Sequence, residues 1–180
     1  MAPAAVPVDD LLALAIRFVN AGQPERARQL CDHALATLPP HPAVQQLLAV
    51  LVLQQGDAAS ALEFATRSLT LRPGHEPTRQ VAADAWFRLS LERQDGRDLA
   101  GAAQALREVL RLAPGRAEAE VNLGIVLQEA GEIDAAMRAY GRAYRLREDT
   151  FGRIAHALST PNVGRLWLRL DDLRAALQAA

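Results

Sequence analysis

The sequence predicts an all-α fold, a solenoid of helical hairpins. Three observations favour it: small and apolar residues recur with a step of 34 residues, Gly and Pro interrupt the chain at matching places, and only 4% of the residues are aromatic while alanine is abundant. Strands prefer β-branched and aromatic residues, whereas alanine suits closely packed helices. We therefore expect about four repeated hairpins followed by a C-terminal capping helical segment.

The first repeat follows a short tail. Residues 1–7 are expected to be flexible, because their prolines block regular structure. A helix is predicted over residues 8–20, before the breaking pair Ala21–Gly22. Its apolar face contains Leu11, Leu14, Ala15 and Phe18. Pro24 suits the first turn of a second helix. The inward positions of that helix hold Ala27, Cys31 and Ala34.

The second repeat copies the first at a shift of 34 residues. The matching pairs are Leu14 and Leu48, Ala15 and Ala49, Phe18 and Val52, Gly22 and Gly56, Ala27 and Ala61, and Pro39 and Pro73. Agreement at positions of several kinds does not arise from composition alone, so we infer that the whole hairpin is duplicated.

The third repeat contains an insertion. It begins in phase at Ala83, but its second half is late, since Ala102 follows Ala61 by 41 residues. The seven extra residues are about two helical turns, so the first helix of this repeat can lengthen without rotating its buried face. A turn is expected at Asp95–Gly96, with Asp98 capping the next helix.

The fourth repeat, residues 117–150, resumes the step of 34. Its first helix should end at Ala130–Gly131, where glycine suits a left-handed terminal residue. Asp134 then places negative charge in the first turn of the next helix, where the helix dipole favours it. Glu148 stands where earlier repeats have a proline.

This period resembles that of the tetratricopeptide repeat (TPR) family. In that family a small residue lets the two helices of a repeat cross closely. The matching positions here hold Ala15, Ala49, Ala83 and Gly124, and a second small position holds Ala27, Ala61, Ala102 and Ala136. The family's early tryptophan is absent from every repeat. The resemblance implies repeats at 8–41, 42–75, 76–116 with the seven-residue insertion, and 117–150.

Residues 151–180 depart from the repeat and are expected to be capping helices, because repeat arrays need an atypical end over the last apolar face. FGRIAHAL should be a short helix that ends near Ser159. Beyond it, a spacing of four, three and four residues favours an amphipathic helix through Leu166, Leu170, Leu173 and Leu177. The alternative is a short strand at GRLWL, followed by a helix capped by Asp171.

Composition excludes several kinds of chemistry. The net charge of -1 gives no general attraction to nucleic acid or to an anionic membrane. All 20 basic residues are arginine, which excludes lysine Schiff bases and a phosphate-loop lysine. One cysteine cannot form an internal disulfide, and no apolar run of about 18 residues predicts a membrane span. We therefore expect a cytoplasmic protein with no membrane partner.

No catalytic, cofactor or metal motif is found, and we expect none of these activities. His41 and His75 occupy equivalent turns, but no carboxylate or thiol repeats beside them at ligand spacing. We interpret them as polar turn residues. Cys31 is interpreted as a packing thiol rather than a nucleophile, because no histidine is evidently placed to activate it.

Arginines gather late in the chain, with eight against four acids in residues 138–174. A basic end could meet an acidic partner or nucleic acid. Only Tyr144 and Trp167 could stack on bases there, however, so we interpret the arginines as a solvated face and expect no nucleic-acid partner.

TPR proteins commonly bind partners along a concave face formed by the first helix of each repeat. The resemblance and helical geometry place there Leu12, Ile16, Val19, Gln46, Val50, Leu53, Gln80, Asp84, Phe87, Arg88, Val121, Ile125 and Gln128. This face is mostly apolar, which suits an amphipathic helix or an extended apolar peptide.

One familiar class of partner is not expected. TPR proteins that hold the acidic C-terminal tails of heat-shock chaperones use a clamp of Lys, Arg and Asn side chains. The matching places here hold Leu12, Ile16, Leu47, Pro77 and Val81. The charged clamp is therefore missing.

The leading hypothesis is a non-catalytic scaffold that binds a partner helix or peptide in an apolar concave groove. One alternative is a homo-oligomer whose apolar surface is buried by its own copies. Another is an accessory subunit of an enzyme encoded nearby, for example a transferase, an idea that rests on architecture alone.

Overall fold

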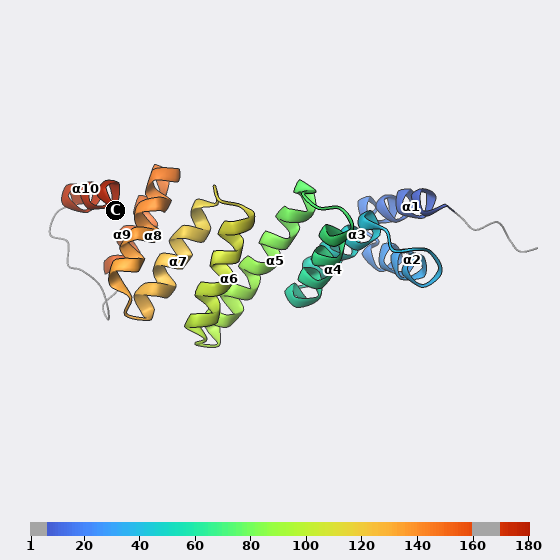
Figure 1. Ribbon diagram of the computed structural model, residues 1–180, viewed down its shortest axis with the longest axis horizontal. Helices are drawn as coiled ribbons and strands as arrows, with labels where there is room; N and C mark the ends of the chain where they lie inside the picture. Colours follow the sequence, from blue (N-terminus) through green and yellow to red (C-terminus); the bar gives the residue numbers. More distant parts are fainter. Residues whose placement is uncertain (1–6, 160–169) are drawn as a thin grey trace, which may run out of the picture. The chain divides into compact units, whose positions relative to one another are not determined.

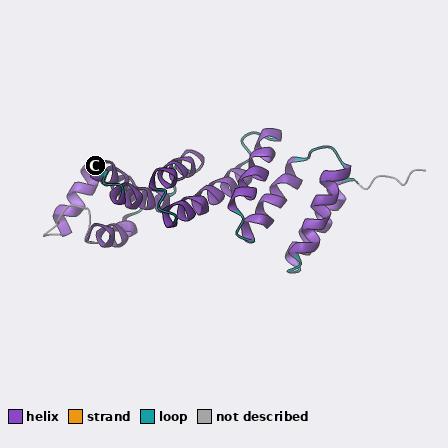
Figure 2. Cartoon of the chain, turned by 90° about the horizontal axis from the view of Figure 1, so that it is seen from below, coloured by secondary structure: helices purple, strands orange, loops and turns teal. Residues whose placement is uncertain are grey.

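The structure is a computed structural model that describes residues 7–159 and 170–180. These residues form α-helices and one short 3-10 helix, with no strand among them, so the predicted all-α fold is confirmed. The chain divides into two compact units, residues 1–85 and 86–180. Figure 1 shows the helices in chain order, and Figure 2 shows the short loops that join them.

Unit 1 contains two helical hairpins. The first is α1 (Val8–Asn20) with α2 (Pro24–Thr37), and the second is α3 (Pro42–Gln54) with α4 (Ala58–Leu71). The expected bounds of the first helix are confirmed. Gly22 and Gly56 follow the first helix of each hairpin with positive φ values of 71° and 96°, a backbone state that glycine adopts without steric cost.

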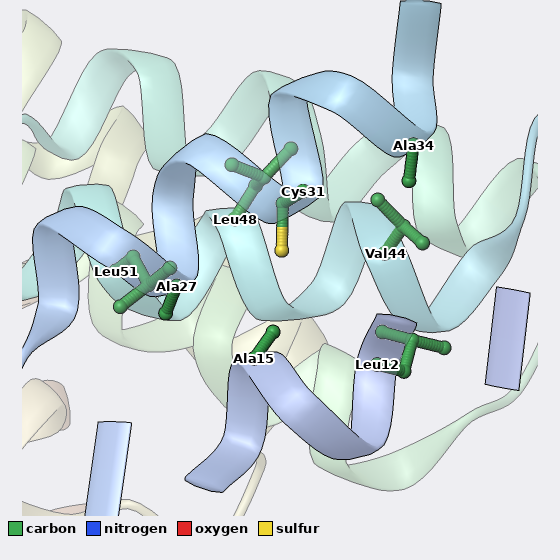
Figure 3. Close-up of a cluster of buried hydrophobic side chains, with 8 residues drawn as sticks. All are labelled: Leu12, Ala15, Ala27, Cys31, Ala34, Val44, Leu48 and Leu51. Carbon is green, nitrogen blue, oxygen red and sulfur yellow. The ribbon is translucent and has the colours of Figure 1, made fainter. Parts of the chain in front are cut away.

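The core of the first hairpin is built from small side chains and leucines. Figure 3 shows the Cys31 side chain among buried residues of α1, α2 and α3, which are Leu12, Ala15, Ala27, Ala34, Val44, Leu48 and Leu51. Cys31 is 2% exposed, which agrees with a packing thiol. Burial, and secondly the Asp32 carboxylate, raise the pKa of Cys31 from 9.0 to about 11.

One residue of the predicted apolar face of α1 is not buried. Leu14 is 40% exposed, although Leu48 and Leu123 hold the same repeat position and are 0% and 3% exposed. Leu48 lies in α3, which packs against the preceding helix α2. Leu123 lies in α7, which packs against the preceding helix α6. No helix precedes α1 among the described residues. Leu14 therefore belongs to the predicted apolar face of α1 but is left partly uncovered.

Helix α5 (Glu76–Asp95) begins in unit 1 and continues into unit 2. It has 20 residues, whereas α1, α3 and α7 each have 13. The predicted seven-residue lengthening is confirmed. The turn after α5 also falls where expected, and the Asp98 side chain accepts a hydrogen bond from the Gly101 amide at 2.9 Å. The left-handed residue of this turn is Arg97, with φ 62°.

Unit 2 continues with the helices that follow α5. They are α6 (Leu99–Leu112), α7 (Ala117–Glu129), α8 (Ile133–Leu146), the 3-10 helix η1 (Glu148–Thr150), α9 (Phe151–Ser159) and α10 (Leu170–Ala179). Gly131 ends α7 with φ 82°, as expected. Helix α7 is packed by α6, α8 and α9, so most of its side chains are buried.

The capping segment is helical where the structure describes it. Helix α9 matches the predicted FGRIAHAL helix. The GRLWL stretch and Leu166 lie outside the described residues, as do residues 1–6. Leu173 and Leu177 are buried, as the spacing predicts, but Leu170 is 55% exposed. The expectation that Leu170 shares the covered apolar face is wrong, since the buried side of the described part of α10 is formed by Leu173 and Leu177.

Candidate partner-binding surfaces

In unit 1, four of the expected concave-face residues form an apolar set on α1 and α3. Ile16 is 49% exposed. Val19, Val50 and Leu53 are half-buried, as is the neighbouring Gln46. Gln80 and Asp84 are exposed on α5. We call Ile16, Val19, Val50 and Leu53 the unit 1 apolar set.

Leu12 does not belong to an accessible surface. It is 9% exposed and packs in the same cluster as Val44 and Leu48. Because α1 turns this side chain toward α3, Leu12 contributes to the core. Its expected role in partner contact is corrected on this ground.

In unit 2, the expected residues divide between surface and interior. Ile125 and Phe87 are half-buried, and Arg88 is exposed. The Arg116 guanidinium carbon lies 4.5 Å from the centroid of the Phe87 ring, a cation–π contact. Val121 and Gln128 are 0% and 7% exposed. Because α7 is packed by three helices, neither side chain is open to a partner, and both expectations are corrected.

Gln128 instead connects three helices of unit 2. The Tyr140 hydroxyl of α8 donates to Gln128 Oε1 at 2.9 Å. Gln128 Nε2 donates to the Ala157 carbonyl of α9, also at 2.9 Å. Burial, and secondly the negative charge of Glu129, raise the pKa of the Tyr140 hydroxyl. It therefore stays protonated and able to donate.

A partly buried ion pair in unit 2 has no local signal in the sequence. Arg142 Nε donates to Glu120 Oε1 at 2.6 Å, and Arg142 Nη2 donates to Glu120 Oε2 at 2.9 Å. The Glu120 side chain is 7% exposed, whereas that of Arg142 is 44% exposed. The sequence suggests only a helix-start carboxylate and a solvated arginine. Their pairing depends on how α7 packs against α8.

Other late arginines also bind within unit 2. Arg153 Nη2 donates to Asn122 Oδ1 at 3.0 Å. Arg147 donates twice to the Asp149 carboxylate, at 3.0 and 2.6 Å. Part of the basic segment therefore connects α7, α8, η1 and α9, which differs from a face that only contacts solvent.

The two repeated histidines have different surroundings. His75 Nδ1 lies 2.9 Å from Thr78 Oγ1, and Thr78 Oγ1 lies 3.4 Å from Ser68 Oγ. His41 Nδ1 is buried without a hydrogen-bond partner. The residue equivalent to Thr78 is Val44, which has no hydroxyl. In the part of the chain that the structure describes, no three potential metal ligands come together.

Within residues 7–159 and 170–180, none of the helices combines the length and the apolar character that crossing a membrane requires.

Helical hairpins in succession, with a small residue at each crossing, place this chain among helical-repeat proteins. No protein-family model matches the chain. A structure of MamA from Desulfovibrio magneticus RS-1 has a TM-score of 0.61 at 18% identity, covering 93% of this chain and 88% of that one. YrrB, described as a TPR protein with an unusual peptide-binding site, has a TM-score of 0.56 at 18% identity, covering 79% and 70%. The chain therefore has the tetratricopeptide-repeat fold.

Curated proteins match shorter stretches. Tetratricopeptide repeat protein 8 of Caenorhabditis elegans is 39% identical over 83 residues, 46% of this chain and 16% of that protein. The probable biofilm formation methyltransferase WspC of Pseudomonas putida KT2440 is 39% identical over 66 residues, 37% of this chain and 16% of that protein. The matched stretch thus spans a small part of each relative's length.

Proposed function

We propose that this chain is a non-catalytic, cytoplasmic scaffold that binds a partner helix or extended peptide through the first helices of its repeats. The repeats are 8–41, 42–75, 76–116 and 117–150, and residues 151–180 form the capping segment. The proposal requires no cofactor. The proposed contact residues that remain accessible are Ile16, Val19, Gln46, Val50, Leu53, Gln80, Asp84, Phe87, Arg88 and Ile125.

The unit 1 apolar set carries this proposal. Ile16 leaves 49% of its surface exposed on α1, and Val50 is only half-buried on α3. An exposed apolar patch can mark an interaction surface, and an apolar helix face can enter such a surface. The fold shared with YrrB, whose description includes a peptide-binding site, supports the same reading.

The test is capture of a partner by the purified chain, followed by binding of that purified partner to variants. Ile16→Glu and Val50→Glu place charge in the unit 1 apolar set, and Ile125→Glu does so on α7. Leu71→Glu is the matched control, because Leu71 is 45% exposed on α4 and lies outside the proposed surface. We expect the first three to lose binding and Leu71→Glu to retain it. Binding that survives all three charges in folded protein would disprove the proposed surface.

The match to WspC favours a second candidate, an accessory module that acts beside a methyltransferase. Co-purification with a methyltransferase encoded near this gene, and loss of that association in Val50→Glu, would support it. This candidate function would be excluded if the methyltransferase did not bind the chain and if the activity of the enzyme were the same with and without the chain.

Self-association remains a competing use of the same apolar surface. Light scattering on the purified chain separates self-association from partner binding, since a monomer at micromolar concentration would eliminate the homo-oligomer.

A further inference from the structure

Helix α10 lies against α8 (Figure 1). It contacts this surface mainly through two leucines, since Leu173 and Leu177 are 1% and 0% exposed. The opposite side of α10, which includes Ala175 and Gln178, is exposed. α10 is therefore an amphipathic helix held on one face.

The surface of α8 is specialised for close approach by another helix. A Cβ atom added at Gly141 would lie 2.8 Å from the Leu177 carbonyl oxygen and 2.9 Å from Ala180 Cβ. The first three repeats carry Asp32, Thr66 and Arg107 at the equivalent position. Those three side chains are exposed, whereas Gly141 is buried. Glycine occurs at this position only in the repeat where a helix covers it.

Arg145 contacts the last turn of that helix. Its Nη1 donates to the Leu177 carbonyl at 3.2 Å and to the Gln178 carbonyl at 3.4 Å. The last carbonyl groups of a helix lack partners within the helix, and positive charge is favoured there. The surface thus contacts the backbone of α10 as well as its apolar face.

Two aromatic rings extend the surface toward α9. The Arg174 guanidinium carbon lies 4.5 Å from the centroid of the Phe151 ring. The Phe151 and Tyr144 ring centroids are 6.0 Å apart with an interplanar angle of 58°. A cation on the incoming helix therefore has an aromatic face to contact.

The helical state of α10 depends on this surface. Isolated helices shorter than about 12–15 residues are marginal in water, and the described part of α10 has 10 residues. Folding of α10 and its docking on α8 are thus coupled. A short segment that buries two leucines belongs to the parts of a protein that open locally before the rest unfolds.

We propose that Gly141, Tyr144, Arg145 and Phe151 form a helix-binding site that α10 occupies as an internal ligand, in competition with a partner helix. That partner carries two leucines four residues apart and a small residue three positions after the second leucine, as Leu173, Leu177 and Ala180 do. The close approach at this end is to Gly141, where an added Cβ would lie 2.9 Å from Ala180 Cβ. This site is separate from the unit 1 apolar set and does not rest on the proposed function.

The test uses the full chain and a fluorescent peptide with the sequence of residues 170–180. Leu173→Asp with Leu177→Asp, the release variant, removes the internal ligand by placing charge on its buried face. We expect the peptide to bind the release variant, and to bind the wild type roughly tenfold or more weakly because the tethered α10 competes. Adding Gly141→Leu to the release variant should abolish binding, and a peptide carrying Leu177→Asp should not bind.

A release variant that keeps its helical circular dichroism yet does not bind the peptide would overturn the proposal. Unchanged binding after Gly141→Leu would do the same. Should the release variant not fold, Gly141→Leu alone provides the test by hydrogen exchange. The amides of residues 170–180 should then exchange faster than in the wild type, and unchanged protection there would also overturn the site.

Discussion

The ring of Tyr140 lies against the backbone of Gly124, where α8 crosses α7. A Cβ atom added at Gly124 would lie 2.9 Å from Tyr140 Cζ and closer still to Cδ1 and Cε1. Tyr140 is 0% exposed. Equivalent positions in the first two repeats hold Ala15 with Cys31 and Ala49 with Ala65. The fourth repeat therefore has a bulky tyrosine at this position of its second helix and, opposite it, a glycine at the crossing position of its first helix.

Enlarging Gly124 should destabilise unit 2. Gly124→Leu overlaps the Tyr140 ring, and overpacking of this kind costs about 1–3 kcal/mol or more. Urea unfolding followed by circular dichroism measures the loss. Gly152→Ala is the control, because an added Cβ there meets nothing within 4 Å in the exposed first turn of α9. It should be neutral or stabilising. Equal losses for the two variants would contradict the contact.

Much of this packing could be predicted, because it follows from local pattern. The 34-residue step indicates the crossing position of Gly124, and the delay at Ala102 predicts the longer α5. Side chains whose burial depends on a later helix could not be assigned. Gln128 faces α9 and donates a hydrogen bond to the Ala157 carbonyl. The sequence pattern of a single repeat instead predicts that Gln128 lies on the exposed concave face. The expected sites thus fail where a neighbouring helix covers them.

The same limit applies to pairings between distant residues. Nothing near Glu120 indicates Arg142, and nothing near Gly141 indicates the approach of Leu177. A comparison between repeats does give a signal for the second, since Asp32, Thr66 and Arg107 mark Gly141 as unusual. The meaning of that signal becomes clear only once α10 is seen on α8.

Arg97 should be a site of avoidable backbone strain. Its φ of 62° is left-handed, whereas the equivalent Gly22, Gly56 and Gly131 adopt positive φ as glycines. Left-handed backbone costs a side-chain-bearing residue roughly 1–2 kcal/mol. Arg97→Gly should therefore stabilise the chain by about 0.5–1 kcal/mol in chemical denaturation, after the entropy of the unfolded glycine is counted. Gly131→Ala should shift stability in the opposite direction, and an effect of the same sign for both variants would refute this account.

The unpaired His41 ring predicts an effect of reciprocal substitutions. Val44→Thr gives His41 Nδ1 the hydroxyl that Thr78 gives His75. A satisfied hydrogen bond contributes about 0.5–1.5 kcal/mol, so Val44→Thr should raise the midpoint of urea unfolding. Thr78→Val should lower it, because His75 and Ser68 lose a partner. A loss in Val44→Thr as large as that in Thr78→Val would show that His41 does not use the new hydroxyl.

The buried thiol should make stability depend on pH in the alkaline range. The pKa of Cys31 is about 11 in the folded chain against an ordinary value of 9.0. As pH rises, the thiol therefore ionises in the unfolded chain before it does so in the folded chain. The free energy of unfolding keeps the full contribution of the neutral buried thiol below pH 9.0 and loses it as pH rises toward 11. Between pH 9.0 and 11, the free energy of unfolding should fall less steeply with pH in Cys31→Ala than in the wild type. Identical slopes would mean that Cys31 does not contribute.

The longer α5 has a consequence for how such chains diversify. Seven residues return a helix to nearly its starting orientation, within about 20°, whereas five would turn the following chain by about 140°. Arg93, in the added length, donates to the Gly101 carbonyl at 3.0 Å, and Gln94 donates to Glu129 on α7 at 3.0 Å. The insertion has thus acquired attachments of its own. A helix in such a repeat can therefore gain or lose whole turns during evolution while its buried face keeps the same orientation. Helix length can vary between repeats, whereas the direction of the buried face is kept.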